Sequence, residues 1–176
     1  MSDAAASRAR HLRLMAFDVD GVMTDGSIYY TDAGTELKAF NALDGAGLKL
    51  LENAGITVAI ITGRKAGCVE ARARNLGITR LHQGVHDKVA CLRTLLDELG
   101  LDATQAGFMG DDVMDLGAMA FCGFSAAPAN AHDRTLQQAT LVTRRSGGRG
   151  AVREVCDFIL EAQGRTDEAI APWLPQ

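Results

Sequence analysis

The stretch LRLMAFDVDGVMTDG, residues 12–26, decides the fold class of this 176-residue chain. It begins with an apolar run typical of a buried strand and then presents Asp18 and Asp20 with one residue between them. Two carboxylates this close repel each other unless a cation or a shared proton holds them together. The segment therefore indicates either a solvated turn or a metal site at the end of a strand.

Further short apolar runs along the chain predict a mainly parallel sheet. Each run ends at a polar or glycine residue, and amphipathic stretches with leucines or valines at helical spacing separate the runs, as in βαβ units. We therefore expect an α/β fold with a doubly wound, Rossmann-like sheet flanked by helices. The expected strands are 12–18, 56–62, 106–110, 122–126 and 140–143.

One segment interrupts this alternation of strands and helices. Residues 27–40, SIYYTDAGTELKAF, contain two β-prone runs around the turn signal DAGT and predict a hairpin appended to the first strand. The hairpin is too short to be a separate domain. We expect a single domain over residues 1–176, with a C-terminal tail at 164–176.

Composition excludes several classes of function. The net charge of −4 and sequence pI of about 5.5 argue against binding of nucleic acid. No stretch has the apolar length of a secretory signal or a membrane helix, so we expect a cytoplasmic protein. The four cysteines stand without a C-x-x-C pair and are expected to be buried thiols. His82 and His86 flank a loop signal and do not predict a shared metal.

Polar residues follow the predicted strands at the edge where parallel sheets bind ligands. Taken singly, each is typical of a loop, a helix cap or a surface lysine. Together, the carboxylates would destabilise one another unless Mg²⁺ took their oxygens as ligands, and a lysine and a hydroxyl opposite would suit a phosphate. This composition indicates phosphoryl transfer without a nucleotide P-loop, whose pattern is absent. The residues are Asp18, Asp20, Thr62, Lys88, Asp111, Asp112 and Asp115.

Four motifs in order carry a resemblance to a known family. DVDGVMTDG at 18–26, ITGR at 61–64, Lys88 and GDDVMD at 110–115 resemble the signature motifs of the haloacid dehalogenase superfamily of phosphohydrolases. Longer stretches, such as ELKAFNALDGAGLKLL and GGRGAVREVCDFIL, resemble the members that dephosphorylate 3-deoxy-D-manno-octulosonate 8-phosphate in lipopolysaccharide biosynthesis. The resemblance implies a Mg²⁺-dependent phosphomonoester hydrolase that works through an aspartyl-phosphate intermediate.

The resemblance also implies roles for the acidic residues. Asp18 would be the nucleophile and a metal ligand. Asp20 would protonate the leaving sugar oxygen, activate water and bind the metal through its backbone carbonyl. Asp111 would complete the protein ligands of the metal, and Asp112 and Asp115 would orient Lys88 or metal-bound water.

A second group of residues would bind the substrate. Thr62, Gly63 and Lys88 would hold phosphoryl oxygens, and Lys88 would also offset charge in the transition state. Arg64 would pair with the carboxylate of the sugar acid, although a surface arginine at a helix start is an equally good interpretation. Arg149 lies in the glycine-rich loop TRRSGGRG, which would close over an anion or, more simply, form an exposed helix entry.

Superfamily members often carry a cap domain, and this chain has no room for one. The gaps at 21–61 and 63–87 are already filled by the hairpin and by one βα unit each. The resemblance implies that a neighbouring subunit closes the open site, in a homotetramer built around the hairpin. A lone aromatic hairpin more often packs on its own domain. The expected interface residues are Ile28, Tyr29 and Tyr30, and the tail of an adjacent chain, with Trp173, would help the loop at 143–150 to close over an anion.

The sequence leaves a rival substrate and two other classes of function to be weighed against this one. Leu43 stands where many relatives have an arginine, which leaves substrate recognition open, and a nine-carbon ester such as 2-keto-3-deoxynonulosonate 9-phosphate is the nearest rival substrate. A receiver-type signalling domain also uses Mg²⁺, aspartate, threonine and lysine, but Val19 splits the first acidic pair here and Lys88 precedes GDD. A phosphatase-like module without turnover is disfavoured because every expected catalytic position is filled.

Overall fold

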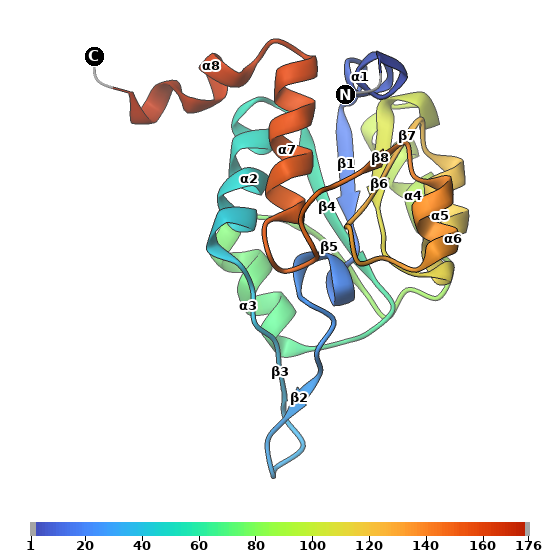
Figure 1. Ribbon diagram of the computed structural model, residues 1–176. Helices are drawn as coiled ribbons and strands as arrows, with labels where there is room; N and C mark the ends of the chain where they lie inside the picture. The colour runs from blue at the N-terminus through green and yellow to red at the C-terminus, as the bar shows by residue number, and fades with distance from the viewer. Residues whose placement is uncertain (1–2, 175–176) are drawn as a thin grey trace.

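A computed structural model describes residues 3–174 and shows a central parallel sheet with helices on both faces (Figure 1). The sheet has the strand order β5-β4-β1-β6-β7-β8, and a separate antiparallel pair joins β2 to β3. The strands are β1 (Leu14–Phe17), β2 (Tyr29–Tyr30), β3 (Glu36–Leu37), β4 (Thr57–Thr62), β5 (Arg80–Gln83), β6 (Ala106–Met109), β7 (Phe124–Ala127) and β8 (Leu141–Val142).

The helices form two layers around this sheet. In Figure 1, α2, α3 and α7 cover one face, and α4, α5 and α6 cover the other. Within residues 3–174, no helix combines the length and the apolar character needed to cross a bilayer. The helices are α1 (Asp3–Ala9), α2 (Ala42–Asn53), α3 (Gly67–Leu76), α4 (Lys88–Leu99), α5 (Leu116–Phe121), α6 (Asp133–Gln138), α7 (Ala151–Ala162) and α8 (Thr166–Ile170).

Side chains of β1 alternate between two apolar cores. Met15 and Phe17 belong to the core beneath α2 and α7, whereas Leu14 and Ala16 belong to the core beneath α4 and α5. All four side chains are fully buried. Because both faces of the sheet are covered, the strand is a continuous apolar run rather than an alternating one.

The doubly wound α/β fold with an appended hairpin, predicted from the sequence, is confirmed. The predicted strands correspond to β1, β4, β6, β7 and β8, with small differences at their ends. The edge strand β5 escapes prediction because its sequence, RLHQ, is largely polar and its side chains are only half-buried. His82, which the sequence places in a loop, lies in this strand.

The cysteines are all free, as expected, but they differ in burial. Cys122 and Cys156 are buried, and burial raises the pKa of the Cys122 thiol to about 12. Cys68 and Cys91 are only half-buried, so the expectation of buried thiols is wrong for these two.

The order of the strands fixes where a ligand can bind. With the hairpin strands set aside, the sheet runs 3-2-1-4-5-6, the order of dinucleotide-binding folds. Receiver-like domains have the order 2-1-3-4-5, so that alternative is wrong. Since β1 pairs with β4 on one side and with β6 on the other, the order of the strands reverses between β1 and β6, and their carboxyl ends mark the place where folds of this kind bind ligands.

The packing of α2 on α7 gives a test of the core. Leu51 of α2 is fully buried, whereas Leu43 on the same helix is 51% exposed. We expect Leu51→Ala to lower the free energy of unfolding by about 2–5 kcal/mol because it leaves a cavity. Leu43→Ala should change it by less than about 0.5 kcal/mol. Urea denaturation followed by circular dichroism measures both, and equal losses would contradict this packing.

Candidate active site

The loop that follows β1 lies at the carboxyl end of the sheet. The backbone N–H of Asp18 donates to the last carbonyl of β6 at 3.0 Å, which extends the sheet by one residue. The chain then makes a π-type turn, Val19–Met23, in which Val19 is buried and Gly21 has a φ of 81°. The N–H of Thr24 closes the turn by donating to the Val19 carbonyl at 3.0 Å. The turn thus buries the residue between the two aspartates in the apolar core.

Three carboxylates and one ammonium meet at the crevice between β1 and β6. One oxygen each from Asp18, Asp111 and Asp115 lies within 4.8 Å of the others. Lys88 Nζ, at the start of α4, lies 3.0 Å from Asp18 Oδ2 and 2.6 Å from Asp115 Oδ1. Asp18, Lys88 and Asp115 are buried, whereas Asp111 is half-buried. The structure therefore brings together residues from three separate motifs of the sequence.

Asp115 braces this cluster through both of its oxygens. Oδ1 contacts Lys88, and Oδ2 accepts hydrogen bonds from the N–H groups of Asp111 at 3.0 Å and Asp112 at 3.4 Å. Gly110 leaves the space for this arrangement, since a Cβ there would lie 2.3 Å from the Asp115 Cβ. The Asp112 carboxylate caps the short 3₁₀ turn that follows. Both residues thus hold the loop that presents Asp111.

The cluster has more negative than positive charge. Burial, reinforced by Asp115, raises the pKa of Asp18 to about 6 although Lys88 opposes the shift. Burial, followed by repulsion from Asp115 and Asp18, raises the pKa of Asp111 to about 7. Burial disfavours the charged form of Lys88, but Asp18 and Asp115 outweigh it and raise the pKa of Lys88. A cation bound here would offset the excess negative charge.

Thr62 is the last residue of β4, the strand beside β1, and Gly63 follows it. Because Phe17 pairs with Ile60, the end of β4 lies at the same edge as Asp18. Thr62 is 2% exposed, and a Cβ on Gly63 would meet only the Val85 carbonyl oxygen, at 3.7 Å. The backbone at Gly63 is therefore open on the side where a Cβ would stand.

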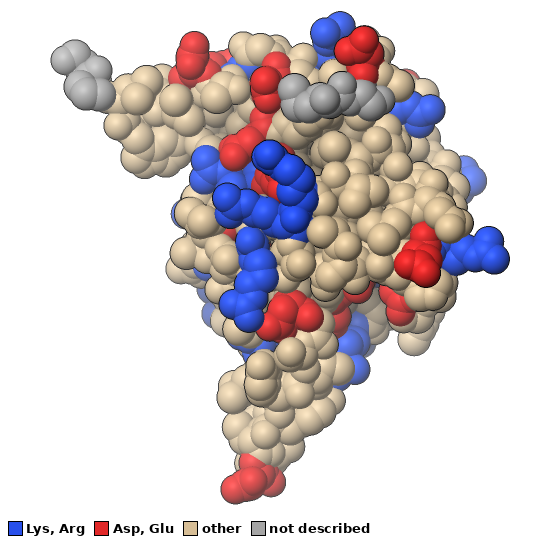
Figure 2. Space-filling view, viewed as in Figure 1, with Lys and Arg blue, Asp and Glu red and all other residues tan. Residues whose placement is uncertain are grey.

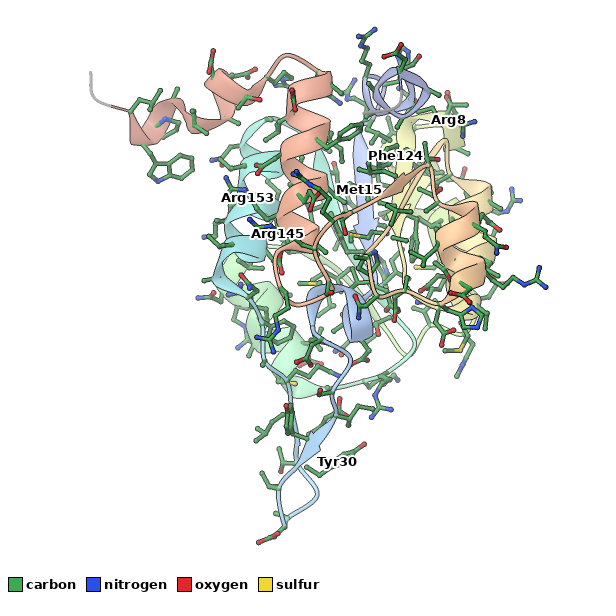
Figure 3. All side chains as sticks on the ribbon, in the orientation of Figure 1. Arg8, Met15, Tyr30, Phe124, Arg145 and Arg153 are labelled. Carbon is green, nitrogen blue, oxygen red and sulfur yellow. The ribbon has the colours of Figure 1, made fainter. Side chains whose placement is uncertain are left out.

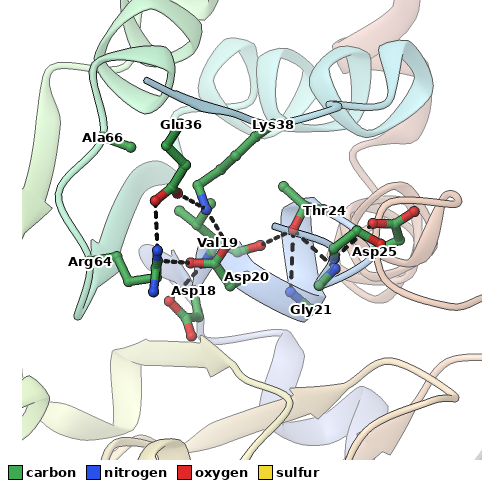
Figure 4. A network of polar contacts seen from close by, with 12 residues as sticks. Asp18, Val19, Asp20, Gly21, Thr24, Asp25, Glu36, Lys38, Arg64 and Ala66 are labelled. Carbon is green, nitrogen blue, oxygen red and sulfur yellow. Dashed lines mark hydrogen bonds and ion pairs between the residues drawn. The ribbon is translucent and has the colours of Figure 1, made fainter. Parts of the chain in front are cut away.

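Two charged residues that sequence reasoning missed, Glu36 and Lys38, join the hairpin to the site (Figure 4). Lys38 Nζ contacts Asp20 Oδ1, and it lies 2.6 Å from Glu36 Oε1. Arg64 Nη2 donates to Glu36 Oε2 at 2.6 Å and to the Tyr30 hydroxyl at 2.9 Å. The Asp20 side chain thus belongs to this hairpin network and lies apart from the carboxylate cluster. The spacing of Glu36 and Lys38, two apart on one side of a strand, is the sequence signal that points to such a pair.

The glycine-rich loop at 143–150 packs against the loop that follows β1. The N–H of Gly148 donates to the Val22 carbonyl at 3.0 Å, and a Cβ on Gly147 would lie 1.7 Å from the Gly21 carbonyl oxygen. Arg149 pairs with Asp25 at 3.3 Å, and its side chain is 71% exposed. The structure therefore places Arg149 beside the site and outside the carboxylate cluster.

A cavity of about 690 Å³ lies along α7 and is bordered by β8, the loop at 143–150 and the first turn of α2; its lining includes none of the predicted site residues. Figure 2 shows basic side chains gathered over the start of α7, and Figure 3 shows Arg145 and Arg153 there. Acidic partners hold two of the arginines: Arg144 pairs with Glu154, and Arg153 pairs with Asp157. The lining is Leu43, Leu141, Arg144, Arg145, Gly150, Arg153, Glu154, Asp157, Phe158 and Glu161.

Comparisons of sequence agree with this geometry. The family model of haloacid dehalogenase-like hydrolases matches residues 78–155. The chain is 50% identical over 169 residues to 3-deoxy-D-manno-octulosonate 8-phosphate phosphatase KdsC of Yersinia pestis, which covers 96% of this chain and 90% of the relative. It is 48% identical over 163 residues to KdsC of Escherichia coli K12, covering 93% of this chain and 87% of the relative.

Solved structures extend the likeness to three dimensions. The Yersinia pestis phosphatase superposes with a TM-score of 0.93 at 50% identity, over 95% of this chain and 90% of that one. The phosphatase from Moraxella catarrhalis, solved in complex with magnesium, phosphate and KDO, gives a TM-score of 0.95 at 41% identity, over 99% of this chain and 100% of that one. Because identity extends over nearly the whole chain, the protein belongs to the 3-deoxy-D-manno-octulosonate 8-phosphate phosphatases, a family of haloacid dehalogenase-like hydrolases.

Proposed function

We propose that this protein hydrolyses 3-deoxy-D-manno-octulosonate 8-phosphate to the free sugar acid and phosphate, with Mg²⁺ as cofactor. It would act in the cytoplasm, as an enzyme of lipopolysaccharide biosynthesis. The observation that carries the proposal is that buried Asp18 lies beside both Lys88 and half-buried Asp111, in a chain 50% identical to such an enzyme. The same identity favours the eight-carbon substrate over the nine-carbon rival.

The carboxylate cluster fits a hard divalent cation. Its three carboxylate oxygens lie within 4.8 Å of one another, and oxygen is the ligand that Mg²⁺ prefers. We assign the side chains of Asp18 and Asp111 and the backbone carbonyl of Asp20 as protein ligands. Asp115, whose two oxygens already accept hydrogen bonds, and Asp112 support them. Bound Mg²⁺ supplies positive charge to the nucleophile and to a phosphoryl oxygen.

The residues of the chain divide the reaction into two displacements. Asp18 attacks phosphorus and becomes an aspartyl phosphate as the bond from phosphorus to the sugar oxygen breaks. Asp20 gives a proton to the leaving sugar oxygen and then takes one from the water that hydrolyses the aspartyl phosphate. Thr62, the N–H of Gly63 and Lys88 bind the phosphoryl oxygens and stabilise charge as it spreads over them.

Two arginines are assigned to the sugar acid. Arg64 Nε lies 3.8 Å from Asp20 Oδ2, so its guanidinium is close to where the leaving oxygen is protonated. Glu36 and Tyr30 engage its Nη2, and its buried Nε faces Asp20, which leaves the N–H groups of Nη1 for the sugar carboxylate. Arg149 is held by an exposed ion pair, which is worth at most about 1 kcal/mol and is readily exchanged for a substrate anion.

We further propose one domain over residues 1–176 that assembles into a homotetramer through the hairpin. The hairpin projects from the body (Figure 1) and carries few charged side chains along its stem (Figure 2). An isolated two-stranded hairpin is marginally stable at best, so a second copy would stabilise it. The exposed apolar side chains are Ile28 at 44%, Tyr29 at 52%, Tyr30 at 62% and Leu37 at 51%.

The C-terminal tail would close the site of a neighbouring subunit. Helix α8 packs against α2 and α7 through buried Ala169, and the chain beyond it points away from the body (Figure 1). Near its end, Trp173 is 62% exposed and Leu174 is 51% exposed. The last part of the expected tail, 175–176, lies outside the described residues.

The activity is tested by comparing the two acid sugar phosphates. With Mg²⁺ present, we expect phosphate release from the eight-carbon ester and slower release from 2-keto-3-deoxynonulosonate 9-phosphate.

Asp18→Asn should lower turnover more than about 1,000-fold because it removes the nucleophile, with an unchanged circular dichroism spectrum. A preference for the nine-carbon ester would reverse the substrate assignment, and near-normal turnover of Asp18→Asn would overturn the assignment of the nucleophile.

In the presence of EDTA, which removes divalent cations, the stability of the protein should fall as pH rises. The folded state raises the carboxyl pKa values from 3.8 to about 6 for Asp18 and about 7 for Asp111, so it binds protons more tightly than the unfolded state. Their contribution to stability is therefore full below about pH 4 and is lost as pH rises through about 7. In EDTA, the free energy of unfolding should fall between about pH 5 and pH 8, and the fall should be about 1–2 kcal/mol smaller for Asp111→Asn than for the wild type.

Urea denaturation measures this difference. Addition of Mg²⁺ at about pH 8 should raise the stability of the wild type more than that of Asp111→Asn, because the variant lacks one ligand. Equal pH dependence of the two proteins, or equal responses to Mg²⁺, would contradict the assignment of Asp111.

The assembly is tested by placing charge on the hairpin. We expect Leu37→Glu, which puts a carboxylate among the exposed apolar side chains, to shift the protein from a tetramer to a smaller species in light scattering after size exclusion. Asp32→Asn, in the hairpin turn, serves as the control and should leave the mass unchanged. A wild-type protein with the mass of a monomer would rule out the homotetramer.

A further inference from the structure

We infer that Lys38 is a positioning residue that holds the carboxylate of Asp20 in the place from which it exchanges protons with the sugar oxygen and water. The inference deepens the proposed function and rests on the acid and base role of Asp20. It assigns part of the catalytic geometry to the hairpin.

The loop after β1 fixes only the backbone of Asp20. Thr24 ties the turn together, because its N–H donates to the Val19 carbonyl at 3.0 Å and its hydroxyl oxygen accepts from the N–H of Gly26 at 3.2 Å. Asp20 itself has an extended conformation, with φ −73° and ψ 122°. None of these bonds restrains the rotation of the Asp20 side chain, so another part of the chain must set the direction of the carboxylate.

Lys38 supplies this restraint from the far arm of the hairpin. Its ammonium forms an ion pair with Asp20 Oδ1, and Arg64 Nε lies 3.8 Å from the other oxygen (Figure 4). The Lys38 side chain is 1% exposed, whereas that of Asp20 is 22% exposed. The carboxylate thus retains access to a ligand, while the ammonium behind it is enclosed by protein.

Glu36 holds Lys38 in turn. Lys38 Nζ lies 2.6 Å from Glu36 Oε1, and Arg64 Nη2 lies 2.6 Å from Glu36 Oε2. Hydrogen bonds from Arg64 and then Lys38 lower the pKa of Glu36 to about 2, so it stays ionised. Glu36 therefore anchors the ammonium during both displacements, while Asp20 gives up and regains its proton.

Position decides the efficiency of proton transfer. A general acid must lie within about 2.6–3.2 Å of the atom that it protonates, and a misplacement of about 1 Å can cost about 100-fold in rate. Because the Lys38 side chain is enclosed, it acts through Asp20 rather than on the substrate. Its loss should therefore matter most for leaving groups that need a proton, a dependence that a general loss of folding would not produce.

A series of substituted phenyl phosphates tests this inference. The series runs from 4-nitrophenyl to phenyl and 4-methoxyphenyl phosphate, so that the leaving oxygen becomes steadily more basic. These esters lack the sugar carboxylate and so do not involve the role proposed for Arg64 in binding it. The quantity measured is kcat/KM, which covers the steps through departure of the leaving group. The proteins are wild type, Lys38→Met, Glu36→Gln, Asp20→Asn and, as the control, Lys49→Met on the exposed side of α2.

We expect Lys38→Met to lower kcat/KM about 10- to 100-fold for phenyl phosphate and less than about threefold for 4-nitrophenyl phosphate. The loss of kcat/KM should depend more steeply on the leaving group in Asp20→Asn than in Lys38→Met. In Glu36→Gln it should depend on the leaving group in the same direction but less steeply, and in Lys49→Met it should not depend on it. If Lys38→Met does not fold, the Glu36→Gln dependence decides the outcome.

The outcomes separate the two levels of the proposal. Suppose that the loss of kcat/KM in Asp20→Asn depends steeply on the leaving group, but that Lys38→Met loses kcat/KM equally for all esters or not at all. This result would overturn the role of Lys38 and leave the proposed function intact. If Asp20→Asn shows the same dependence on the leaving group as the wild type, then the acid role of Asp20 itself is wrong.

Discussion

Lys88 places one buried positive charge between Asp18 and Asp115, at 3.0 Å and 2.6 Å, and the surrounding structure keeps it there. The first turn of α4 fixes its backbone, because Asp87 caps the helix by accepting from the N–H of Ala90 at 2.9 Å. The ammonium also lies 5.6 Å from the centre of the Phe108 ring on β6. Without this charge, two buried carboxylates would face each other unpaired, which typically costs about 3–5 kcal/mol. The burial of the Asp18 carboxylate therefore depends on where α4 begins.

Two kinds of support surround this charge. The sheet provides the first, since β1, β4 and β6 end at one edge and set the backbones of Asp18, Thr62 and Asp111. Polar contacts between segments far apart in the sequence provide the second. Buried Asp44 on α2, for example, accepts from the N–H of Arg153 at 2.9 Å and thereby caps α7, which follows the glycine-rich loop. The position of that loop thus depends on α2 as well as on its own sequence.

Sequence patterns predict the first kind of support well and the second poorly. The apolar run before Asp18 and the strand ahead of GDDVMD specify buried parallel strands, and the edge rule then gathers Lys88 and Asp111 with Asp18. The contact of Lys38 with Asp20 has no local signal, because it forms only when the hairpin folds back over the turn after β1. The orientation of Arg149 toward Asp25 likewise depends on how the loop at 143–150 packs.

The contact between Gly147 and Gly21 limits how this enzyme can be redesigned. A Cβ at position 147 would lie 1.7 Å from the Gly21 carbonyl oxygen, and one at position 148 would lie 2.5 Å from the backbone of Thr24 and Asp25. A library that randomises the whole glycine-rich loop to change substrate preference would therefore also displace the backbone of the loop after β1 wherever it puts a side chain at position 147 or 148. The side chains of Arg144 and Arg145 are exposed and take no part in that contact, so these are the positions at which such a library can be diversified.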